Sequence, residues 1–345
     1  MNDSITIARP DDWHVHFRDQ ELLSRTVLDT AQYFSRALVM PNLVPPLTTL
    51  ESLLAYRERI SSVLSHASGF EAMMSFYLNE ALQPDTLKEA KAYPFILGAK
   101  LYPAGVTTNS EAGTKSIKAI YPLLETMQDL NLVLQVHGEV NYGDIFEREA
   151  CFIENVLKPL TRDFPKLRIV LEHISTKAAV DFVQQSSDNV AATITIHHLL
   201  YNRNQLLAGG LRPHYYCLPI LKSATEQQAV QAAALSGNPK FFAGTDSAPH
   251  EQRKKENACG CAGIYSAPFA LPLYCQFFAE QNSLPKLESF VSHYGADFYQ
   301  LERNKDTIKL FKKSQTIPES LPMGNGFVIP IAAGETIKWS VYDAR

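Results

Sequence analysis

Residues 130–174 read LNLVLQVHGEVNYGDIFEREACFIENVLKPLTRDFPKLRIVLEHI and contain one strand–helix–strand unit. Two runs rich in Val, Ile and Leu, 130–139 and 166–174, flank the amphipathic stretch 147–164. Continuous apolar runs of this kind indicate parallel strands that are covered on both faces, and the stretch between them indicates a crossover helix. The segment therefore predicts an α/β fold.

The same alternation continues along most of the chain. Together with the two runs above it predicts eight strands, the others at 4–17 (SITIAR joined to DDWHVHF), 36–43, 71–78, 94–102, 189–198 and 239–247. Further helices are expected at 48–67, 116–130 and 176–187. Eight such units predict a (β/α)8, or TIM, barrel. A doubly wound open sheet is the alternative, but it calls for a glycine-rich phosphate loop after the first strand, and the sequence has none there.

The last part of the chain departs from this rhythm. Prolines and glycines interrupt it at Pro318, Pro322, Gly324 and Gly326, and the β-like run FVIPIAAGETIKWSV follows. We predict that residues 1–303 form the barrel and that residues 304–345 form a short C-terminal extension packed on it.

The composition of the chain indicates which kind of binding partner to expect. The 345 residues are 46% hydrophobic and 20% charged, with a formal net charge of −4, so no basic field attracts nucleic acid. No apolar run approaches the roughly 18 residues that suggest a membrane span. The first residues lack the basic and apolar regions of a signal peptide, and an odd number of cysteines, five, suits a reducing compartment. We expect a cytoplasmic protein that binds a small molecule and neither nucleic acid nor a membrane.

Polar side chains at the ends of the predicted strands indicate a site. The C-terminal strand ends of such barrels meet at one mouth, and here they carry His14, His16, Lys100, His137, His173 and Asp246. His14 and His16 are two residues apart, so they share one face of an extended strand. Each residue alone has an ordinary explanation, such as a surface position for Lys100 or a helix N-cap for Asp246. Their common placement predicts a metal site.

The chemistry of this residue set favours two ions. Imidazoles and a carboxylate suit zinc or a similar ion, and six ligands are too many for one tetrahedral zinc. A lysine fits among them if its amine has reacted with carbon dioxide, because the resulting carbamate is an anion that can bridge two ions. Two ions about 3.5–4 Å apart can hold a bridging hydroxide and polarise a carbonyl, and Asp246 could pass a proton to a leaving amide nitrogen. The predicted reaction is hydrolysis, or reversible condensation, of an amide-like bond.

Three further residues indicate what the substrate carries. Arg18 follows the histidine pair by two residues, Asn42 ends the second strand, and His250 lies just after Asp246. A guanidinium group recognises a carboxylate with two parallel hydrogen bonds, and the other two side chains are further candidate donors. Alone, Arg18 could instead pair with Asp19, and Asn42 could shape its loop. Together they predict a substrate with at least one carboxylate.

Several longer motifs resemble one known family. RPDDWHVHFRD, MPN, AKLYPAG, VHGE, RPHYYCLPILK and GTDSAPH are similar to the motifs of dihydroorotases of the shorter, bacterial type. The resemblance covers roughly residues 7–263 and continues weakly to GETIKWSV. One departure is the stretch 195–198, Thr-Ile-His-His, where the family has a Pro-Gln-His pattern.

The resemblance implies a role for each matching position. It implies two zinc ions, one held by His14, His16 and Asp246 and one by His137 and His173, bridged by a hydroxide and by Lys100 as N6-carboxylysine. Asp246 is implied as the general acid and base. The substrate carboxylate is implied to be held by Arg18, Asn42 and His250, and the ring to contact backbone groups of Leu218 and Ala262. Thr107 and Thr108 match a mobile lid loop, and the family is typically homodimeric.

Three functions are compatible with this site. The resemblance favours the interconversion of N-carbamoyl-L-aspartate and (S)-dihydroorotate in pyrimidine (UMP) biosynthesis. A related cyclic amidohydrolase acting on hydantoins, dihydropyrimidines or allantoin is the first alternative, but such rings lack the carboxylate that Arg18 and Asn42 would hold. A catalytically dead scaffold barrel is the second, but it would not need all six candidate ligands.

Overall fold

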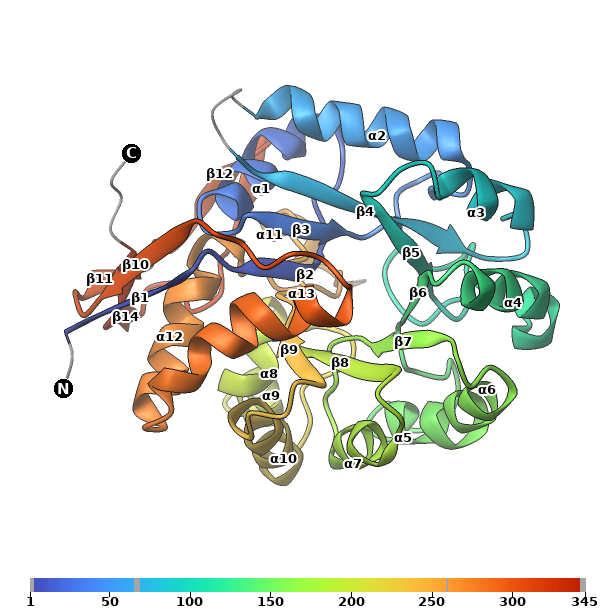
Figure 1. Ribbon diagram of the computed structural model, residues 1–345. Coiled ribbons are helices and arrows are strands. Elements are labelled where there is room, and N and C mark those ends of the chain that lie inside the picture. The colour runs from blue at the N-terminus through green and yellow to red at the C-terminus, as the bar shows by residue number, and fades with distance from the viewer. Residues whose placement is uncertain (1–2, 65–68, 259, 342–345) are drawn as a thin grey trace.

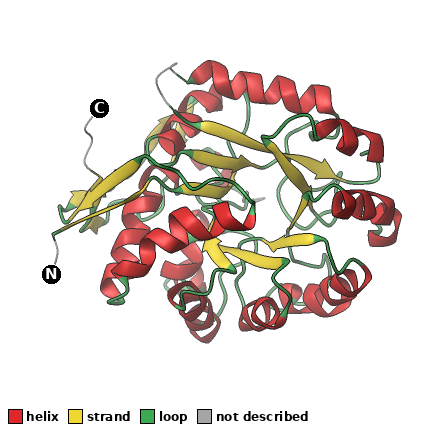
Figure 2. Cartoon of the chain, viewed as in Figure 1, coloured by secondary structure: helices red, strands yellow, loops and turns green. Residues whose placement is uncertain are grey.

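A parallel sheet of eight strands lies at the centre of the computed structural model, which describes residues 3–64, 69–258 and 260–341 (Figure 1). Neighbouring strands are also neighbours in sequence, as expected for successive strand–helix units. Helices lie around the strands (Figure 2). The strands are β2 (Asp11–Val15), β3 (Arg36–Val39), β4 (Glu71–Leu78), β5 (Ile96–Leu101), β6 (Val133–Val136), β7 (Arg168–Leu171), β8 (Val190–Ile194) and β9 (Phe241–Ala243).

The first and last strands of this sheet meet just beyond their carboxyl ends. Val15 and Ser247 form a parallel bridge. The amide of His16 donates to the Ser247 carbonyl at 3.0 Å, and the amide of Asp246 donates to the His14 carbonyl at 2.8 Å. The sheet is therefore a nearly closed barrel, which confirms the predicted (β/α)8 fold and excludes the open sheet.

Apolar residues fill the barrel interior below the strand ends. Leu38, Met73, Val133, Val170 and Phe242 belong to one buried cluster inside the barrel. The same cluster contains Trp13, whose ring stacks on Tyr299 with centroids 4.5 Å apart. This packing fills one end of the barrel, and in barrels of this kind the functional site lies at the opposite, carboxyl end of the strands.

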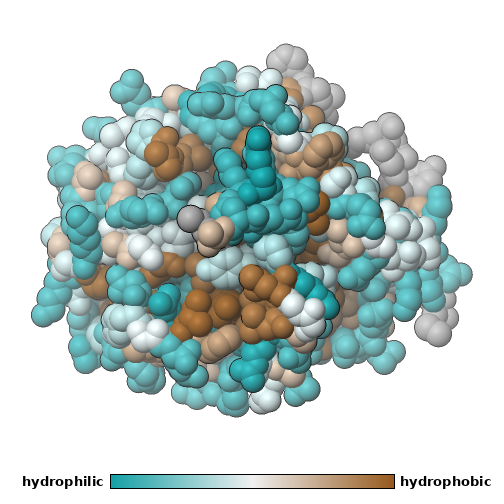
Figure 3. Space-filling view, turned by 180° about the vertical axis from the view of Figure 1, so that it is seen from behind, coloured by the Kyte–Doolittle hydropathy of each residue, from teal (hydrophilic) through white to brown (hydrophobic). Residues whose placement is uncertain are grey.

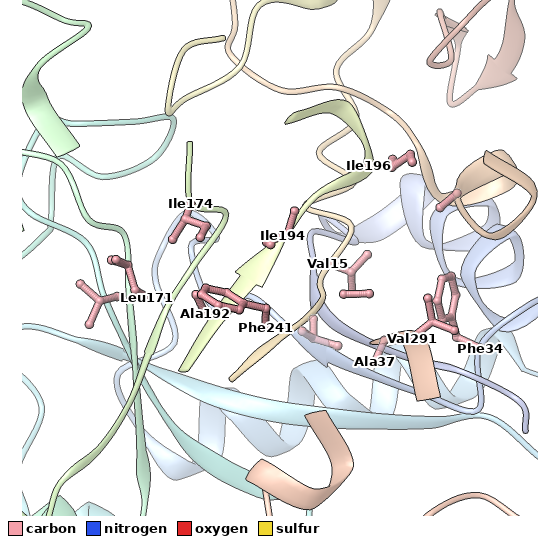
Figure 4. Close-up of a cluster of buried hydrophobic side chains, with 14 of the residues drawn as sticks. Val15, Phe34, Ala37, Leu171, Ile174, Ala192, Ile194, Ile196, Phe241 and Val291 are labelled. Atoms are coloured by element: carbon pink, nitrogen blue, oxygen red, sulfur yellow. The ribbon is translucent and has the colours of Figure 1, made fainter. Parts of the chain in front are cut away.

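A second, larger cluster joins the outside of the barrel to the helices. Figure 4 shows part of it, where Leu171, Ala192, Ile194 and Phe241 lie with Ile174 and other labelled side chains. At β5, Gly98 allows close approach to β6, because an added Cβ would lie 1.8 Å from the Val133 carbonyl oxygen. The strand that carries Lys100 therefore packs closely against β6.

Helices follow the strands in sequence, and several have side-chain caps. Thr49, Thr176 and Ser223 cap their helices through bonds to backbone amides. The α-helices are α1 (Leu23–Ala31), α2 (Leu50–Val63), α3 (Pro84–Ala90), α4 (Tyr121–Asp129), α5 (Arg148–Phe152), α6 (Lys158–Asp163), α7 (Lys177–Gln185), α8 (Ile196–Leu200), α9 (Arg203–Leu207), α10 (Ala224–Leu235), α11 (Gln252–Lys255), α12 (Ala270–Glu280) and α13 (Tyr294–Phe298).

Seven of the eight predicted strand runs extend beyond the observed strands, and two of these runs contain a further element. The run 4–17 is two strands: β1 (Ser4–Ala8) leaves the barrel and pairs antiparallel with β10 (Thr307–Phe311). Pro10 separates β1 from β2, and proline has no amide hydrogen to continue a ladder. The run 189–198 ends as a strand at Ile194, because Thr195 accepts a bond from the His198 amide and caps α8.

Three predicted helices also differ in detail from the observed ones. The expected helix at 116–130 begins with a 3-10 turn, Ile117–Ile120, before α4. The expected helix at 48–67 is α2 over 50–63, and residues 65–67 of that prediction lie outside the described residues. The stretch 147–164 is helical from α5 to α6 through a π-helical turn, Ile153–Leu157.

The C-terminal segment forms small sheets beside the barrel. β10 pairs with β1 and with β15 (Ser340–Val341), and the β1–β10 ribbon projects from the barrel in Figure 1. The other pairs are β11 (Gln315–Thr316) with β14 (Thr336–Ile337), and β12 (Leu321–Met323) with β13 (Gly326–Val328). Because β1 shares this sheet, a boundary at 303/304 stays a prediction. Among the described helices, none has the length and apolar character needed to cross a membrane.

Candidate metal centre

A backbone irregularity in β2 positions the first two candidate ligands. The register of β2 against β3 shifts between Asp12 and Val15, and such bulges re-aim side chains near active sites. Trp13 packs in the cluster inside the barrel, while His14 and His16 line the cavity at its mouth. The expected shared placement of the two histidines is therefore present.

His14, His16 and Asp246 form a tight group of potential ligands. Their ligand atoms all lie within 4.8 Å of one another. The Nε2 atoms of the two histidines are 3.4 Å apart, and Asp246 Oδ1 lies 3.4 Å from His14 Nε2 and 3.1 Å from His16 Nε2. All three side chains are buried.

A second pair of histidines lies beside this group. His137 Nδ1 is 3.2 Å from His173 Nε2, and the ring of His14 lies 5.0 Å from that of His173, centroid to centroid. Lys100, on β5, is fully buried, and its amine has no hydrogen-bond partner among the described residues. All six predicted ligands thus converge at the mouth of the barrel.

Neighbouring groups determine which ring nitrogen of three histidines is free. His14 Nδ1 donates to Glu172 Oε2 at 2.9 Å, and His16 Nδ1 donates to Asn42 Oδ1 at 2.8 Å. His137 donates through Nε2 to Glu139 Oε2 at 2.9 Å. The other nitrogen of each neutral ring then carries a lone pair directed into the centre, which is the arrangement seen around metal-bound histidines.

This donor set fits metal ions. Lone pairs of His14 and His16 face each other and the Asp246 carboxylate with no proton to share, and the amine of Lys100 is buried without a partner. Acceptors held this close call for a cation between them, and two imidazoles with a carboxylate suit zinc. A neutral Lys100 amine could also become an anionic carbamate ligand.

The pKa values of these groups favour the protonation states that metal binding requires. Burial lowers the pKa of His16 to about 4 and that of Lys100 to about 8. Burial, assisted by Lys100, also holds the pKa of His173 well below its ordinary value. Burial favours the neutral acid of Asp246, but His14 and His16 outweigh burial and lower its pKa. Near neutral pH His16 and His173 are therefore neutral and Asp246 is a carboxylate, as metal ligands must be.

Backbone strain is concentrated at this centre. Arg18, His173 and Asp246 have φ values of 62°, 42° and 45°, a region that non-glycine residues rarely adopt. Asp12 helps to hold this conformation, since its carboxylate accepts from the Thr245 amide at 2.8 Å and the Thr245 hydroxyl at 2.6 Å. Strain of this kind persists only where the surroundings impose it, and it is often found at active sites.

The predicted substrate residues surround the same cavity. Arg18 bonds through Nε to the Pro249 carbonyl at 3.1 Å, and its Nη2 lies 3.0 Å from His250 Nε2. His250 Nε2 is also 3.0 Å from the Ala262 carbonyl oxygen. The predicted residues that line the cavity are His14, His16, Arg18, Asn42, Thr107, Thr108, His137, His173, Leu218, Asp246 and Ala262. Lys100 and His250 are not in its lining; His250 reaches the site through Arg18.

The loop with Thr107 and Thr108 covers one side of this cavity. The Thr108 hydroxyl donates to the Ala262 carbonyl at 3.3 Å, and Asn42 Nδ2 donates to the Thr108 carbonyl at 3.1 Å. Asn109 Nδ2 donates to the Asn42 carbonyl at 3.1 Å. The loop is therefore tied to two predicted substrate-binding positions.

Several groups of the site were not predicted from the sequence. Glu139 and Glu172 orient two histidines, Asp12 supports Thr245, and Tyr102 lines the cavity. For Glu139 the signal available was adjacency, because it lies two residues after His137, to which it bonds, and carboxylates that bond to ligand histidines are common. Glu172 precedes His173 but bonds to His14, so adjacency does not indicate its partner.

A second group of potential ligands lies at the stretch where the sequence departs from the family pattern. His197, His198 and Cys217 are buried and close together. Both ring nitrogens of His198 are already bonded, to Thr195 Oγ1 at 2.8 Å and to the Pro219 carbonyl at 3.0 Å. His198 thus holds the segment around Pro219 in place. It could bind an ion only by losing one of these two hydrogen bonds.

Replacement of Glu172 by glutamine should weaken metal binding by about 10- to 100-fold, the usual cost of losing a carboxylate that orients a ligand histidine. The reason is that the His14 Nδ1–H would lose its charged acceptor. Competition with a chromogenic chelator measures this affinity. Glu288→Gln is the matched control, because the Glu288 carboxylate accepts instead from the Ala8 amide. Unchanged affinity in the Glu172 variant would contradict the orienting role.

Comparisons with known proteins show the family to which the chain is similar. Residues 8–313 match the model of the amidohydrolase family. The dihydroorotases of Shewanella sp. (strain ANA-3) and Shewanella oneidensis are each 57% identical to the chain over 340 residues, which is 98% of this chain and 99% of theirs.

Solved structures are similar to the chain over almost its whole length. Dihydroorotase from Saccharomyces cerevisiae, in complex with 5-fluoroorotic acid, superposes with a TM-score of 0.90 at 38% identity, covering 99% of both chains. Dihydroorotase from Campylobacter jejuni has a TM-score of 0.91 at 35% identity, covering 99% of this chain and 98% of that one. An L-hydantoinase from Arthrobacter aurescens shares the fold, with a TM-score of 0.78 at 15% identity, covering 98% of this chain and 83% of that one.

Proposed function

This chain belongs to the dihydroorotases of the amidohydrolase family, and we propose that it interconverts (S)-dihydroorotate and N-carbamoyl-L-aspartate at its metal centre, in pyrimidine (UMP) biosynthesis. In ring opening an amide C–N bond breaks, water supplies a hydroxyl group to the carbon, and a proton reaches the departing nitrogen; ring closure is the reverse. The observation that carries the proposal is the convergence of all six candidate ligands beside Arg18 at one mouth.

Enzymes of this family depend on metal, and the number and bridging of the ions are part of the proposal. We assign His14, His16 and Asp246 to one zinc, and His137 and His173 to the other. Lys100, carboxylated on its amine, would bridge them together with a hydroxide. When bound, the ions would polarise the amide carbonyl and lower the pKa of a water molecule.

Asp246 is the proposed general acid and base. Its carboxylate is ionised near neutral pH because His14 and His16 lower its pKa. It can therefore accept the proton of the attacking water and deliver it to the amide nitrogen during ring opening. In ring closure it moves the proton in the opposite direction, as microscopic reversibility requires.

Arg18, Asn42 and His250 are proposed to hold the ring carboxylate. The Arg18 side chain is half-buried and faces His250, and no carboxylate pairs with it among the described residues. A half-buried cation with remaining donors is suited to an anionic substrate. Backbone groups of Leu218 and Ala262 are proposed to contact the ring, and Thr107 and Thr108 to form a lid that closes over the acyclic ligand.

An assay of ring opening tests the function. The purified protein is given L-dihydroorotate, hydantoin or dihydrouracil, before and after chelation and after zinc is returned. We expect turnover of dihydroorotate alone, lost with the chelator and restored by zinc. Turnover of only an uncharged ring would overturn the carboxylate assignment, and no turnover of any ring by the zinc-loaded protein would indicate an inactive scaffold.

Arg18→Met should raise KM for dihydroorotate by about 10- to 100-fold, because hydrogen bonds to a charged group contribute about 1.5–3 kcal/mol each. Steady-state kinetics across a substrate series measures the effect. Arg25→Met is the control, since Arg25 pairs with Asp29 on α1. A KM within twofold of the wild type would show that the carboxylate binds elsewhere.

We also propose that the protein is a homodimer of the cytosol. Figure 3 shows apolar side chains gathered on one face of an otherwise largely hydrophilic surface. Such exposed apolar patches often mark contacts between proteins. Large apolar residues exposed elsewhere or within this face of the described chain include Tyr142, Leu207 and Leu211, with exposed fractions of 56%, 50% and 73%. The molar mass in solution, from light scattering, distinguishes a dimer from a monomer.

A further inference from the structure

Lys255 is a buried ammonium group beneath the loop that carries Ala262. Its side chain is 4% exposed, and Nζ donates to the carbonyls of Tyr216 at 3.1 Å, Cys261 at 2.9 Å and Gly263 at 2.5 Å. No carboxylate pairs with it among the described residues. All three N–H bonds of this cation are therefore used to fix backbone carbonyls, which is unusual for lysine because buried charges are usually paired.

The position of these acceptors determines the orientation of the peptide group between Cys261 and Ala262. In a trans peptide the C=O and the N–H point in opposite directions. Since the Cys261 carbonyl points to Lys255, the Ala262 N–H points away from it. Ala262 lines the cavity, and within the described chain no group accepts from its amide. An unpaired backbone donor is thus available at the cavity wall.

Other contacts hold the same loop from the opposite side. The Ala262 carbonyl lies within hydrogen-bond distance of His250 Nε2 and of the Thr108 hydroxyl. Gly263 has a φ of 147°, and a Cβ there would lie 2.5 Å from the Ala248 carbonyl oxygen. The loop therefore fits in one place, between Lys255 below and the proposed carboxylate-binding residues above.

We propose that Lys255 is a positioning residue for substrate binding: it aims the Ala262 N–H at the substrate and adds a positive charge behind the Arg18 side of the mouth. This inference rests on the proposed function and deepens it. The charge is present at neutral pH, because burial lowers the pKa of Lys255 only to about 8. The positive charge of Arg18 adds to this lowering of the Lys255 pKa, so the two cations lie close enough for both to attract an anionic substrate.

The test is a comparison of KM and kcat for dihydroorotate in Lys255→Met and the wild type. We expect KM to rise by about 10- to 100-fold, the range for one hydrogen bond to a charged ligand, with kcat within about threefold. The metal ligands are not touched by Lys255, so zinc content should be unchanged. Lys255→Gln keeps two N–H donors and should give an intermediate KM.

Lys222→Met is the matched control. Lys222 is also 4% exposed and donates to a backbone carbonyl, that of Ile145 at 3.3 Å, but it does not line the cavity. We expect it to lose thermal stability without a rise in KM. The proposal is overturned if KM is unchanged in the Lys255 variants, or if Lys222→Met raises KM equally.

The other outcomes are equally decisive. If Lys255→Met does not fold, Lys255→Gln decides by the same criterion, a rise in KM without loss of kcat. Failure of the wild-type enzyme to open dihydroorotate would contradict the proposed function itself, whereas normal wild-type turnover with an unchanged KM in the variants contradicts only the role of Lys255.

Discussion

Replacement of Lys100 by alanine is expected to remove most of the bound zinc and to lower kcat/KM for dihydroorotate by about 10³-fold or more. The size follows from the several kcal/mol that metal ions contribute to stabilising the transition state. Lys100 is fully buried with no hydrogen-bond partner among the described residues, so it has no evident structural bond to lose. Zinc analysis of the purified variant, together with steady-state kinetics, measures both effects.

Chemical rescue separates the bridging role from a packing role. A small carboxylate such as acetate can enter the space that the side chain leaves and supply an anionic ligand, so partial recovery of zinc and activity is expected. Lys222→Ala, another buried lysine, should keep its zinc. Full activity and full zinc content in the Lys100 variant would contradict its assignment as a ligand.

The barrel was predictable from sequence because its evidence is local. Parallel strands covered on both faces are continuous apolar runs, and the chain places one in each unit. The same local pattern misassigned Ser4–Ala8, because an apolar run does not reveal its pairing partner. β1 pairs with β10, about 300 residues away in sequence, and only the tertiary fold determines that choice.

The candidate ligands were predictable for a similar reason. His14, His16, Lys100, His137, His173 and Asp246 were found because strand ends converge in this fold. Their orientation was not predictable, since it depends on contacts such as that between His14 and Glu172, which are 158 residues apart. The positive φ values of His173 and Asp246 also leave no mark in the sequence.

Lys255 shows most clearly what cannot be predicted from the sequence alone. In the sequence it belongs to the run Arg253-Lys254-Lys255-Glu256, which has the pattern of a solvated helix face. In the structure Lys255 turns inward while its neighbours stay exposed. The difference arises from three carbonyls supplied by loops at 216 and 261–263, and no local pattern could have indicated them.

Asp246→Asn is expected to lower kcat by about 10²- to 10⁴-fold, the usual contribution of a general acid and base. The amide has nearly the same shape but cannot accept the proton that the carboxylate accepts. The proposed ligands His14 and His16 remain in place, so zinc content should fall less than in Lys100→Ala. KM should change little, because Arg18 and the Ala262 loop are intact. Kinetics in both reaction directions, with zinc analysis, measures these effects.

Asp11→Asn is the control for loss of a buried carboxylate. Asp11 pairs with Arg36 at the start of β2, with Arg36 Nη2 2.6 Å from Oδ2. Removing one partner of a buried pair is costly to stability, so this variant should unfold at lower temperature and yet keep its kcat. If Asp246→Asn retained its zinc and its kcat, the proton would have to be moved by another group. Because Asp246 is the carboxylate closest to His14 Nε2 and His16 Nε2, that result would remove the proposed acid and base while leaving the metal centre intact.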